Sequence, residues 1–251
     1  MRLIALLQLI MVLALLLLSM VVVAPAWLLR LESLRQRLVL WVFGVMSRLL
    51  GLHVAIKGKL SDQRPLLLVS NHSSYIDIIS LGTAVPVSFT PKSDIRLWPI
   101  IGWCCSLAGC VYVERKPSKL PATRKQIHKA MQLGRVIALF PEGTTNNGHE
   151  LKPFKSGFFS LAEDEADLVI QPATIVYTHR NGMPLTAEGR SEVAWYGDTA
   201  LIPHLLEFLS WKRLDATIHF HEPVTLSAFS DRKALCQHCE QQVQHCLNEY
   251  R

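Results

Sequence analysis

The chain has 251 residues, of which 50% are hydrophobic and only 18% are charged. A chain of this length and composition can bury a substantial core, which excludes an intrinsically disordered protein. The net charge of +6 and the pI near 9.1 indicate an anionic partner. Because the sequence has no basic run and no basic stripe interleaved with aromatic residues, we expect anionic membrane lipids and no nucleic acid as partners.

Residues 3–29 form an apolar segment without charged side chains at the amino terminus. As a helix they would extend about 40 Å, which exceeds the roughly 30 Å thickness of a hydrocarbon layer. A cleaved signal peptide is the alternative, since Ala24-Pro25-Ala26 resembles a cleavage site, but the apolar stretch is about twice the usual length. We therefore predict that residues 1–29 are a transmembrane anchor.

Basic residues are unequally distributed around this segment. Arg30, Arg35 and Arg37 follow it, whereas only Arg2 and the amino terminus precede it. Positively charged flanks stay in the cytoplasm. The sequence therefore predicts a single-pass membrane protein whose catalytic domain lies on the cytoplasmic face.

Short apolar runs alternate with helix-like segments throughout residues 30–251, which suit a single domain. This alternation predicts an α/β fold with a central mixed sheet flanked by helices. The expected strands include residues 110–114 and 193–196. The apolar stretch near residues 38–50 is too short to cross a membrane, and both a core helix and a helix lying in the membrane interface are compatible with it.

Four residues near the carboxyl terminus, Cys236, Cys239, His245 and Cys246, have a spacing that resembles a zinc site. The three cysteines also fall with Val243 on one stripe of a helix, and free cysteine packs well as a small apolar side chain. In the cytoplasm the thiols should be reduced. We therefore predict that these cysteines pack in the core and that the protein holds no metal.

An apolar strand ends at Ser70 and runs directly into Asn71-His72-Ser73-Ser74-Tyr75-Ile76-Asp77. This order places His72 in a loop at the strand end and Asp77 in the first turn of the next helix. The carboxylate can then accept one ring N–H and leave the other ring nitrogen free to take a proton. The pattern is typical of a general base, although Asp77 could instead close a capping box with Ser74.

A second strand, residues 136–140, runs into Pro141-Glu142-Gly143-Thr144-Thr145. Such a turn exposes backbone N–H groups, which could bind an oxyanion or a headgroup, and the glutamate could hydrogen-bond a substrate hydroxyl. Taken alone, the pattern also fits an ordinary turn between a strand and a loop.

Four short blocks in this order resemble the glycerolipid acyltransferase family, which includes the 1-acylglycerol-3-phosphate acyltransferases. The blocks are residues 71–77, 109–115, 140–144 and 170–173. Four blocks in register are far more specific than any one of them. The resemblance implies an O-acyltransferase without a cofactor. It would move a fatty acyl group from acyl-CoA or acyl carrier protein to a lysophospholipid. The acceptor that the resemblance favours most is 1-acyl-sn-glycerol-3-phosphate.

The resemblance also implies roles for single residues. His72 would deprotonate the acceptor hydroxyl, with Asp77 as its partner. The other residues would bind the acceptor, two of them as cations that contact its anionic headgroup. The cations are Arg115 and Lys92, and the remaining acceptor-binding residues are Glu142, Gly143 and Thr144. A solvated surface lysine is an equal alternative for Lys92.

One position departs from the family pattern. Thr145 stands where relatives that use lysophosphatidic acid often carry arginine. A lyso-ornithine lipid O-acyltransferase is therefore an alternative, and residues 194–198 are also similar to that branch. A non-catalytic membrane scaffold is a further alternative, against which the intact His72, Asp77 and Glu142 argue. A serine hydrolase is disfavoured, since the sequence has no Gly-x-Ser-x-Gly motif.

Overall fold

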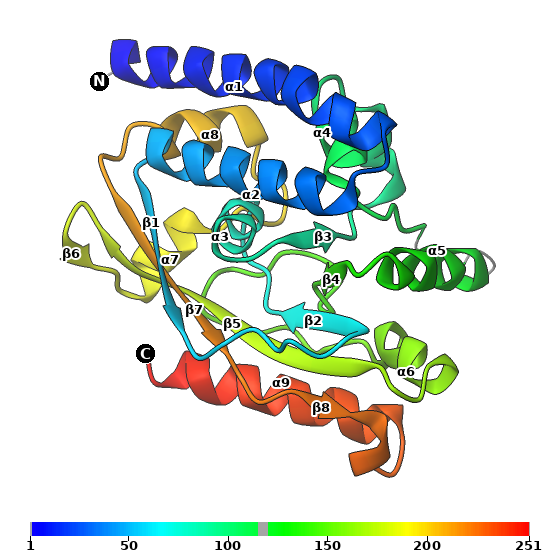
Figure 1. The fold of residues 1–251 in the computed structure, drawn as a ribbon. Coiled ribbons are helices and arrows are strands. Elements are labelled where there is room, and N and C mark those ends of the chain that lie inside the picture. Colours follow the sequence, from blue (N-terminus) through cyan, green and yellow to red (C-terminus); the bar gives the residue numbers. More distant parts are fainter. Residues whose placement is uncertain (1, 115–119, 251) are drawn as a thin grey trace.

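The structure, a computed structural model, describes residues 2–114 and 120–250 (Figure 1). Its centre is an eight-stranded mixed sheet with the order β1-β7-β5-β2-β4-β3, in which β6 and β8 pair with β5. Neighbouring strands are parallel except at β5, which runs antiparallel to β6, β7 and β8. The strands are β1 (Leu52–Lys57), β2 (Leu66–Ser70), β3 (Val87–Phe89), β4 (Val136–Leu139), β5 (Val169–Arg180), β6 (Met183–Pro184), β7 (Leu214–Phe220) and β8 (Val224–Thr225). The predicted α/β fold with a mixed sheet is confirmed.

Helices cover both faces of the sheet (Figure 1). The α-helices are α1 (Arg2–Leu28), α2 (Glu32–Leu49), α3 (Ile76–Ala84), α4 (Ile101–Ala108), α5 (Leu120–Gln132), α6 (Leu161–Asp164), α7 (Ala187–Val193), α8 (Leu201–Phe208) and α9 (Arg232–Asn248), and the short 3-10 helices are η1 (Ser93–Leu97), η3 (Ser156–Ser160) and η4 (Leu226–Ala228). Side chains alternate along β2, so Leu66 and Leu68 join one core and Leu67 and Val69 the other. Residues of α1, α2, α3, α7 and α8 pack in the first core, and residues of α5, α6 and α9 in the second.

The parallel pairing of β2 with β4 and β5 positions the functional motifs. The carboxyl ends of parallel strands meet at one edge of a sheet, and loops at that edge commonly carry binding and catalytic residues. The loop after β2 begins at Asn71, and the turn after β4 begins at Phe140. The first and third sequence blocks are therefore brought together.

Helix α1 lies along α2 and α4 (Figure 1). Leu15 and Val23 are buried on its inner side, and Gln8 Nε2 donates a hydrogen bond to the carbonyl oxygen of Leu49 at 3.2 Å. Ala5–Leu28 is long and apolar enough to cross a membrane. Half of its side chains are exposed and only five of the 24 are buried, which leaves a large apolar face on the surface of the molecule.

Helix α2 extends the predicted helix near residues 38–50 back to Glu32. Its inner side carries Val42 and Met46, which are buried in the first core. Trp41 on its outer side is 52% exposed. The helix therefore has one face in the core and one face open to the surroundings.

A buried arginine ties α2 to the second sequence block. Arg35 is 2% exposed, pairs with Glu32, and donates a hydrogen bond from Nη1 to the carbonyl oxygen of Leu107 at 3.1 Å. Burial opposes ionisation of Glu32, but hydrogen bonds from Arg35 and Arg135 outweigh it and lower its pKa to about 2. Gly109 has φ +77, and a Cβ there would lie 2.3 Å from Arg35 Nη1. Only glycine permits this close approach.

The prediction of a strand at residues 110–114 is wrong. The segment is extended, and Val111 N donates to the carbonyl oxygen of Phe89 at 2.9 Å. Because β3 ends at Phe89, the segment continues past the sheet and meets Lys92, outside the strands, in an isolated bridge from Val113, so that no strand ladder forms. The second block is thus held beside the edge of the sheet.

The prediction of a strand at residues 193–196 is also wrong. Thr186 caps α7 by accepting a hydrogen bond from Gly189 N at 3.2 Å, and the helix continues to Val193. The chain then turns so that Trp195 N donates to the carbonyl oxygen of Ser73 at 2.8 Å. This backbone donor therefore serves the loop after β2 instead of a strand ladder.

The cysteines of α9 pack in the protein interior, as predicted. Cys236, Cys239 and Cys246 are all buried, and the first two pack in the second core with Leu235 and Val243. The helix begins where Asp231 accepts hydrogen bonds from the first-turn N–H groups.

Candidate active site

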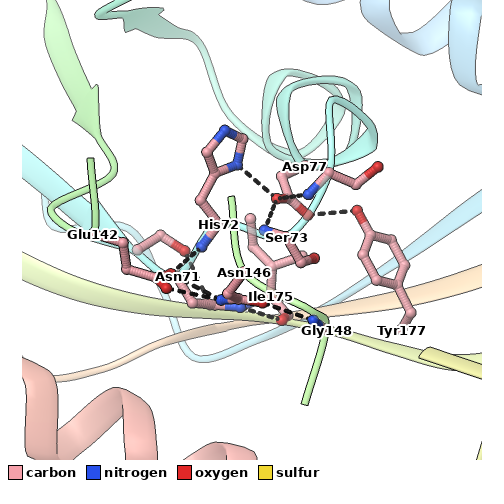
Figure 2. Close-up of polar contacts among 11 residues, drawn as sticks. Asn71, His72, Ser73, Asp77, Glu142, Asn146, Gly148, Ile175 and Tyr177 are labelled. Atoms are coloured by element: carbon pink, nitrogen blue, oxygen red, sulfur yellow. Dashed lines mark hydrogen bonds and ion pairs between the residues drawn. The ribbon is translucent and has the colours of Figure 1, made fainter. Parts of the chain in front are cut away.

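The loop after β2 brings His72 and Asp77 together (Figure 2). His72 Nδ1 lies 2.8 Å from Asp77 Oδ2. Asp77 is fully buried, and Oδ2 also accepts the backbone N–H groups of Ser73 at 2.7 Å and Ser74 at 2.9 Å. The contact with Ser74 is half of the alternative capping box, so Asp77 orders the start of α3 and contacts the histidine at the same time.

Tyr177 of β5 completes the environment of this carboxylate, because its O–H donates to Asp77 Oδ1 at 2.6 Å (Figure 2). An ionised carboxylate accepts all of these donors, so the proton of the His72 ring is on Nδ1 and the lone pair is on Nε2. Burial and the neighbouring carboxylate raise the pKa of Tyr177, which keeps its O–H as a donor. No motif in the sequence points to Tyr177.

The His72 ring lies flat on Phe140, with 4.0 Å between ring centroids and 11° between ring planes. This contact fixes the ring plane, while 19% of the histidine side chain remains exposed. Within residues 2–114 and 120–250, no hydrogen-bond partner reaches Nε2. The nitrogen with the lone pair is therefore available to take a proton from a bound hydroxyl.

The turn after β4 encloses the backbone of His72 (Figure 2). Glu142 Oε1 accepts the His72 N–H at 2.6 Å, and Asn146 N donates to the His72 carbonyl oxygen at 2.8 Å. Asn146 Nδ2 donates to both Glu142 oxygens, and Lys152 N donates to Oε2 at 2.9 Å. Glu142 is 1% exposed, and its carboxylate holds the backbone of the histidine loop, while its predicted role in acceptor binding stays a prediction.

Burial raises the pKa of Glu142 to about 7, although hydrogen bonds from Asn146, His72 and Lys152 oppose the shift. A carboxyl whose pKa is higher in the folded than in the unfolded state takes up a proton on folding. The free energy of unfolding of the wild type, relative to that of Glu142→Gln, should therefore fall as the pH rises from about 4.5 to about 7. The expected decrease is on the order of 3 kcal/mol, and the difference should change little above pH 7. Urea unfolding of both proteins in detergent across this range measures the difference. A difference that does not change with pH would contradict the assignment.

The other predicted site residues occupy different positions around this centre. Gly143 is buried with φ +74, and Thr144 beside it is exposed. Lys92 is bridged to the second block, and its Nζ lies 2.5 Å from Asp94 Oδ2. Arg115 lies outside the residues that the structure describes.

The loop that includes residues 194–198 lies against the histidine loop. Besides the bond from Trp195 N to Ser73, the rings of Trp195 and Tyr75 meet edge to face at 6.1 Å. The Tyr75 hydroxyl lies 3.0 Å from Nδ1 of His204 on α8. In the sequence, residues 194–198 stand out only through their family likeness. The structure places them beside the candidate catalytic residues.

A histidine that is oriented by a buried carboxylate, with no nucleophilic side chain in contact with it among the described residues, is suited to activating a hydroxyl for direct group transfer. A family model described as acyltransferase matches residues 51–176, which contain all four sequence blocks in full. The chain belongs to this acyltransferase family.

Relatives and a solved structure agree with this assignment. The lyso-ornithine lipid O-acyltransferase of Brucella abortus is 37% identical, over 85% of this chain and 82% of its own length. The 1-acyl-sn-glycerol-3-phosphate acyltransferase of Neisseria meningitidis is 28% identical, over 80% and 76%. The crystal structure of the 1-acyl-sn-glycerophosphate acyltransferase PlsC from Thermotoga maritima has the same fold, with a TM-score of 0.63, 20% identity, and coverage of 96% of this chain and 97% of PlsC. The protein is an O-acyltransferase of lipid biosynthesis.

Proposed function

We propose that this enzyme is membrane-bound and transfers a fatty acyl group from a thioester, acyl-CoA or acyl carrier protein, to a hydroxyl of a lyso-lipid. The observation that carries the proposal is the His72 ring, which has one nitrogen hydrogen-bonded to buried Asp77 and the other without a protein partner among the described residues. This arrangement is what a general base for a hydroxyl requires.

In the proposed reaction, His72 Nε2 takes the proton of the acceptor hydroxyl while its oxygen attacks the thioester carbonyl carbon. The tetrahedral intermediate collapses by breaking the C–S bond, and the imidazolium returns the proton to the leaving thiolate. The products are the acyl ester and the free thiol. Asp77 stabilises the imidazolium, while Glu142 and Asn146 hold the backbone that carries it.

The acceptor that we favour is a lyso-ornithine lipid. The relative that acts on this lipid shares more of its sequence with this chain than the Neisseria relative does. In addition, this chain has Thr145 at the position where relatives that use lysophosphatidic acid often carry an arginine, which would suit a phosphomonoester. Lysophosphatidic acid, the acceptor expected first from the resemblance, is the second candidate, because Lys92 beside the second block could meet a phosphate.

A panel of acceptors with the purified full-length enzyme tests this choice. With one acyl-CoA as donor, kcat/KM for lyso-ornithine lipid should exceed kcat/KM for lysophosphatidic acid. The reverse order would establish a 1-acylglycerol-3-phosphate acyltransferase. Transfer to neither acceptor, by an enzyme shown to be folded, would reject the proposed function itself.

Position 145 should control the choice between these acceptors. Thr145 is partly exposed on the turn after β4, and its carbonyl oxygen accepts a hydrogen bond from Lys152 Nζ at 2.7 Å. A charge-assisted hydrogen bond from an added arginine contributes about 1.5–3 kcal/mol. Thr145→Arg is therefore expected to raise kcat/KM for lysophosphatidic acid at least roughly tenfold relative to an acceptor without a phosphomonoester. Equal changes for both acceptors would mean that the side chain at position 145 does not face the headgroup.

We further expect α1 to cross the membrane once, with the catalytic body on the cytoplasmic side. The arginines after α1 favour this orientation. In sealed right-side-out vesicles, a cysteine replacing Arg2 should react with an impermeant maleimide, whereas one replacing Arg37 should react only after lysis. In the structure, α1 packs along α2 and α4. If neither cysteine reacts before lysis, α1 stays packed on the body at the cytoplasmic surface.

A further inference from the structure

A lysine that the family blocks do not include lies at the turn after β4. The ammonium of Lys155 is so close to Gly143 that a Cβ on that glycine would be 2.9 Å from Nζ. Gly143 has φ +74, a conformation that glycine adopts without strain. The glycine therefore supplies both the turn and the space that the lysine side chain occupies.

The position of Lys155 is fixed by its neighbours. Its N–H donates to the carbonyl oxygen of Pro141 at 3.0 Å, and its carbonyl oxygen accepts the N–H of Phe158, also at 3.0 Å. Phe154 and Phe159 on either side of it are buried in the second core. The backbone is thus held against the turn, while the side chain is exposed.

The ammonium of Lys155 has no ion-pair partner within the part of the chain that the structure describes. Neither a carboxylate nor any other hydrogen-bond acceptor contacts its Nζ among these residues. Two other lysines nearby already have partners. Lys152 Nζ, near the turn, donates to the carbonyl oxygen of Thr145, and Lys92, near the second block, pairs with Asp94. An exposed ammonium without a partner at such a turn can bind an anion.

Backbone donors lie next to this ammonium. Within the described chain, the N–H groups of Thr144 and Thr145 find no acceptor. Successive N–H groups in a turn with a positive φ form a concave site for an anion. The turn also contacts the backbone of His72 through Glu142 and Asn146, so an anion bound there is near the candidate base.

We propose that Lys155, together with the open N–H groups of Thr144 and Thr145, binds an anionic group in the headgroup of the acceptor. This inference rests on the proposed function and assigns the cation that position 145 lacks. The shared chemistry is an anion, which is the carboxylate of a lyso-ornithine lipid or the phosphate of lysophosphatidic acid. Lys155 is then a headgroup-binding residue of the acyltransferase.

The test compares Lys155→Met with the wild type on three acceptors, namely lyso-ornithine lipid, lysophosphatidic acid and uncharged monoacylglycerol. The variant should raise KM roughly tenfold for the anionic acceptor that the enzyme uses, because a charge-assisted hydrogen bond is lost. The KM for the acyl donor and any transfer to monoacylglycerol should not change. Lys155→Arg should restore most of the affinity for the anion.

The matched control is Lys129→Met, which removes the same charge from the exposed surface of α5. Its KM values should equal those of the wild type. An unchanged KM for both anionic acceptors in Lys155→Met, or an equal rise for monoacylglycerol, would overturn the proposal while the wild type still transfers acyl groups. Comparing lyso-ornithine lipid with lysophosphatidic acid shows whether a carboxylate or a phosphate binds at the turn, because KM should rise only for the acceptor that binds there.

Discussion

Replacing His72 by alanine is expected to lower kcat by roughly 10²–10⁴-fold, which is the usual contribution of a general base. The fold should persist. Without the ring, Asp77 still accepts hydrogen bonds from Ser73, Ser74 and Tyr177, so no buried charge is left without partners. Acyl transfer by membranes that contain equal amounts of each protein, together with urea unfolding in detergent, measures both quantities.

Near wild-type transfer by a folded His72→Ala protein would reject His72 as the base. A second readout concerns the reaction path. Ser73 and Ser74 are buried, and no cysteine among the described residues contacts His72. We therefore expect no covalently acylated protein in a single turnover with a radiolabelled thioester. Label that stays on the denatured protein would instead indicate a nucleophilic side chain.

Replacing Asp77 by asparagine should lower both activity and stability. The amide has one N–H₂ group in place of an acceptor oxygen, and it would face N–H or O–H donors in a fully buried site. Leaving one buried donor unsatisfied costs about 1–3 kcal/mol. The loss of the carboxylate also removes the preference for a proton on Nδ1 of His72, so kcat should fall by roughly 10²–10⁴-fold.

Tyr177→Phe is the matched control for this prediction, because it removes one donor to Asp77 and leaves the two backbone donors and the histidine in place. It should cost about 1 kcal/mol of stability and much less activity than Asp77→Asn. If the two variants lose activity equally, then Tyr177 takes part in the reaction itself. Full activity of a folded Asp77→Asn protein would reject the dyad.

The sequence was sufficient for those parts of the site that lie within one motif. His72 and Asp77 are five positions apart, and the strand end and helix start between them define their geometry. Tyr177 is 100 positions from Asp77, so its contact depends on the pairing of β2 with β5. Alternation along β5 places Tyr177 on the same face as Ile175, but no local pattern identifies the neighbouring strand.

The direction of Glu142 could not be predicted for a similar reason. Its motif places a carboxylate at a strand end, where it could point to a substrate or into the protein. Three donors decide the matter, and two of them, Asn146 Nδ2 and Lys152 N, lie in a loop without regular structure. The extended residues 110–114 differ from a strand only because β3 is too short to pair with them.

The 100 positions between Asp77 and Tyr177 also have a consequence for the order in which the protein forms in the cell. A ribosome adds about 5–20 residues per second, so roughly 5–20 s pass between the synthesis of Asp77 and that of Tyr177. Helix α1 has left the ribosome long before and can enter the membrane during this interval. The buried carboxylate gains its last donor only when β5 docks beside β2. The hydrogen-bond set of Asp77 can therefore be completed after α1 has met a membrane, and a chain that stops before β5 lacks the Tyr177 donor.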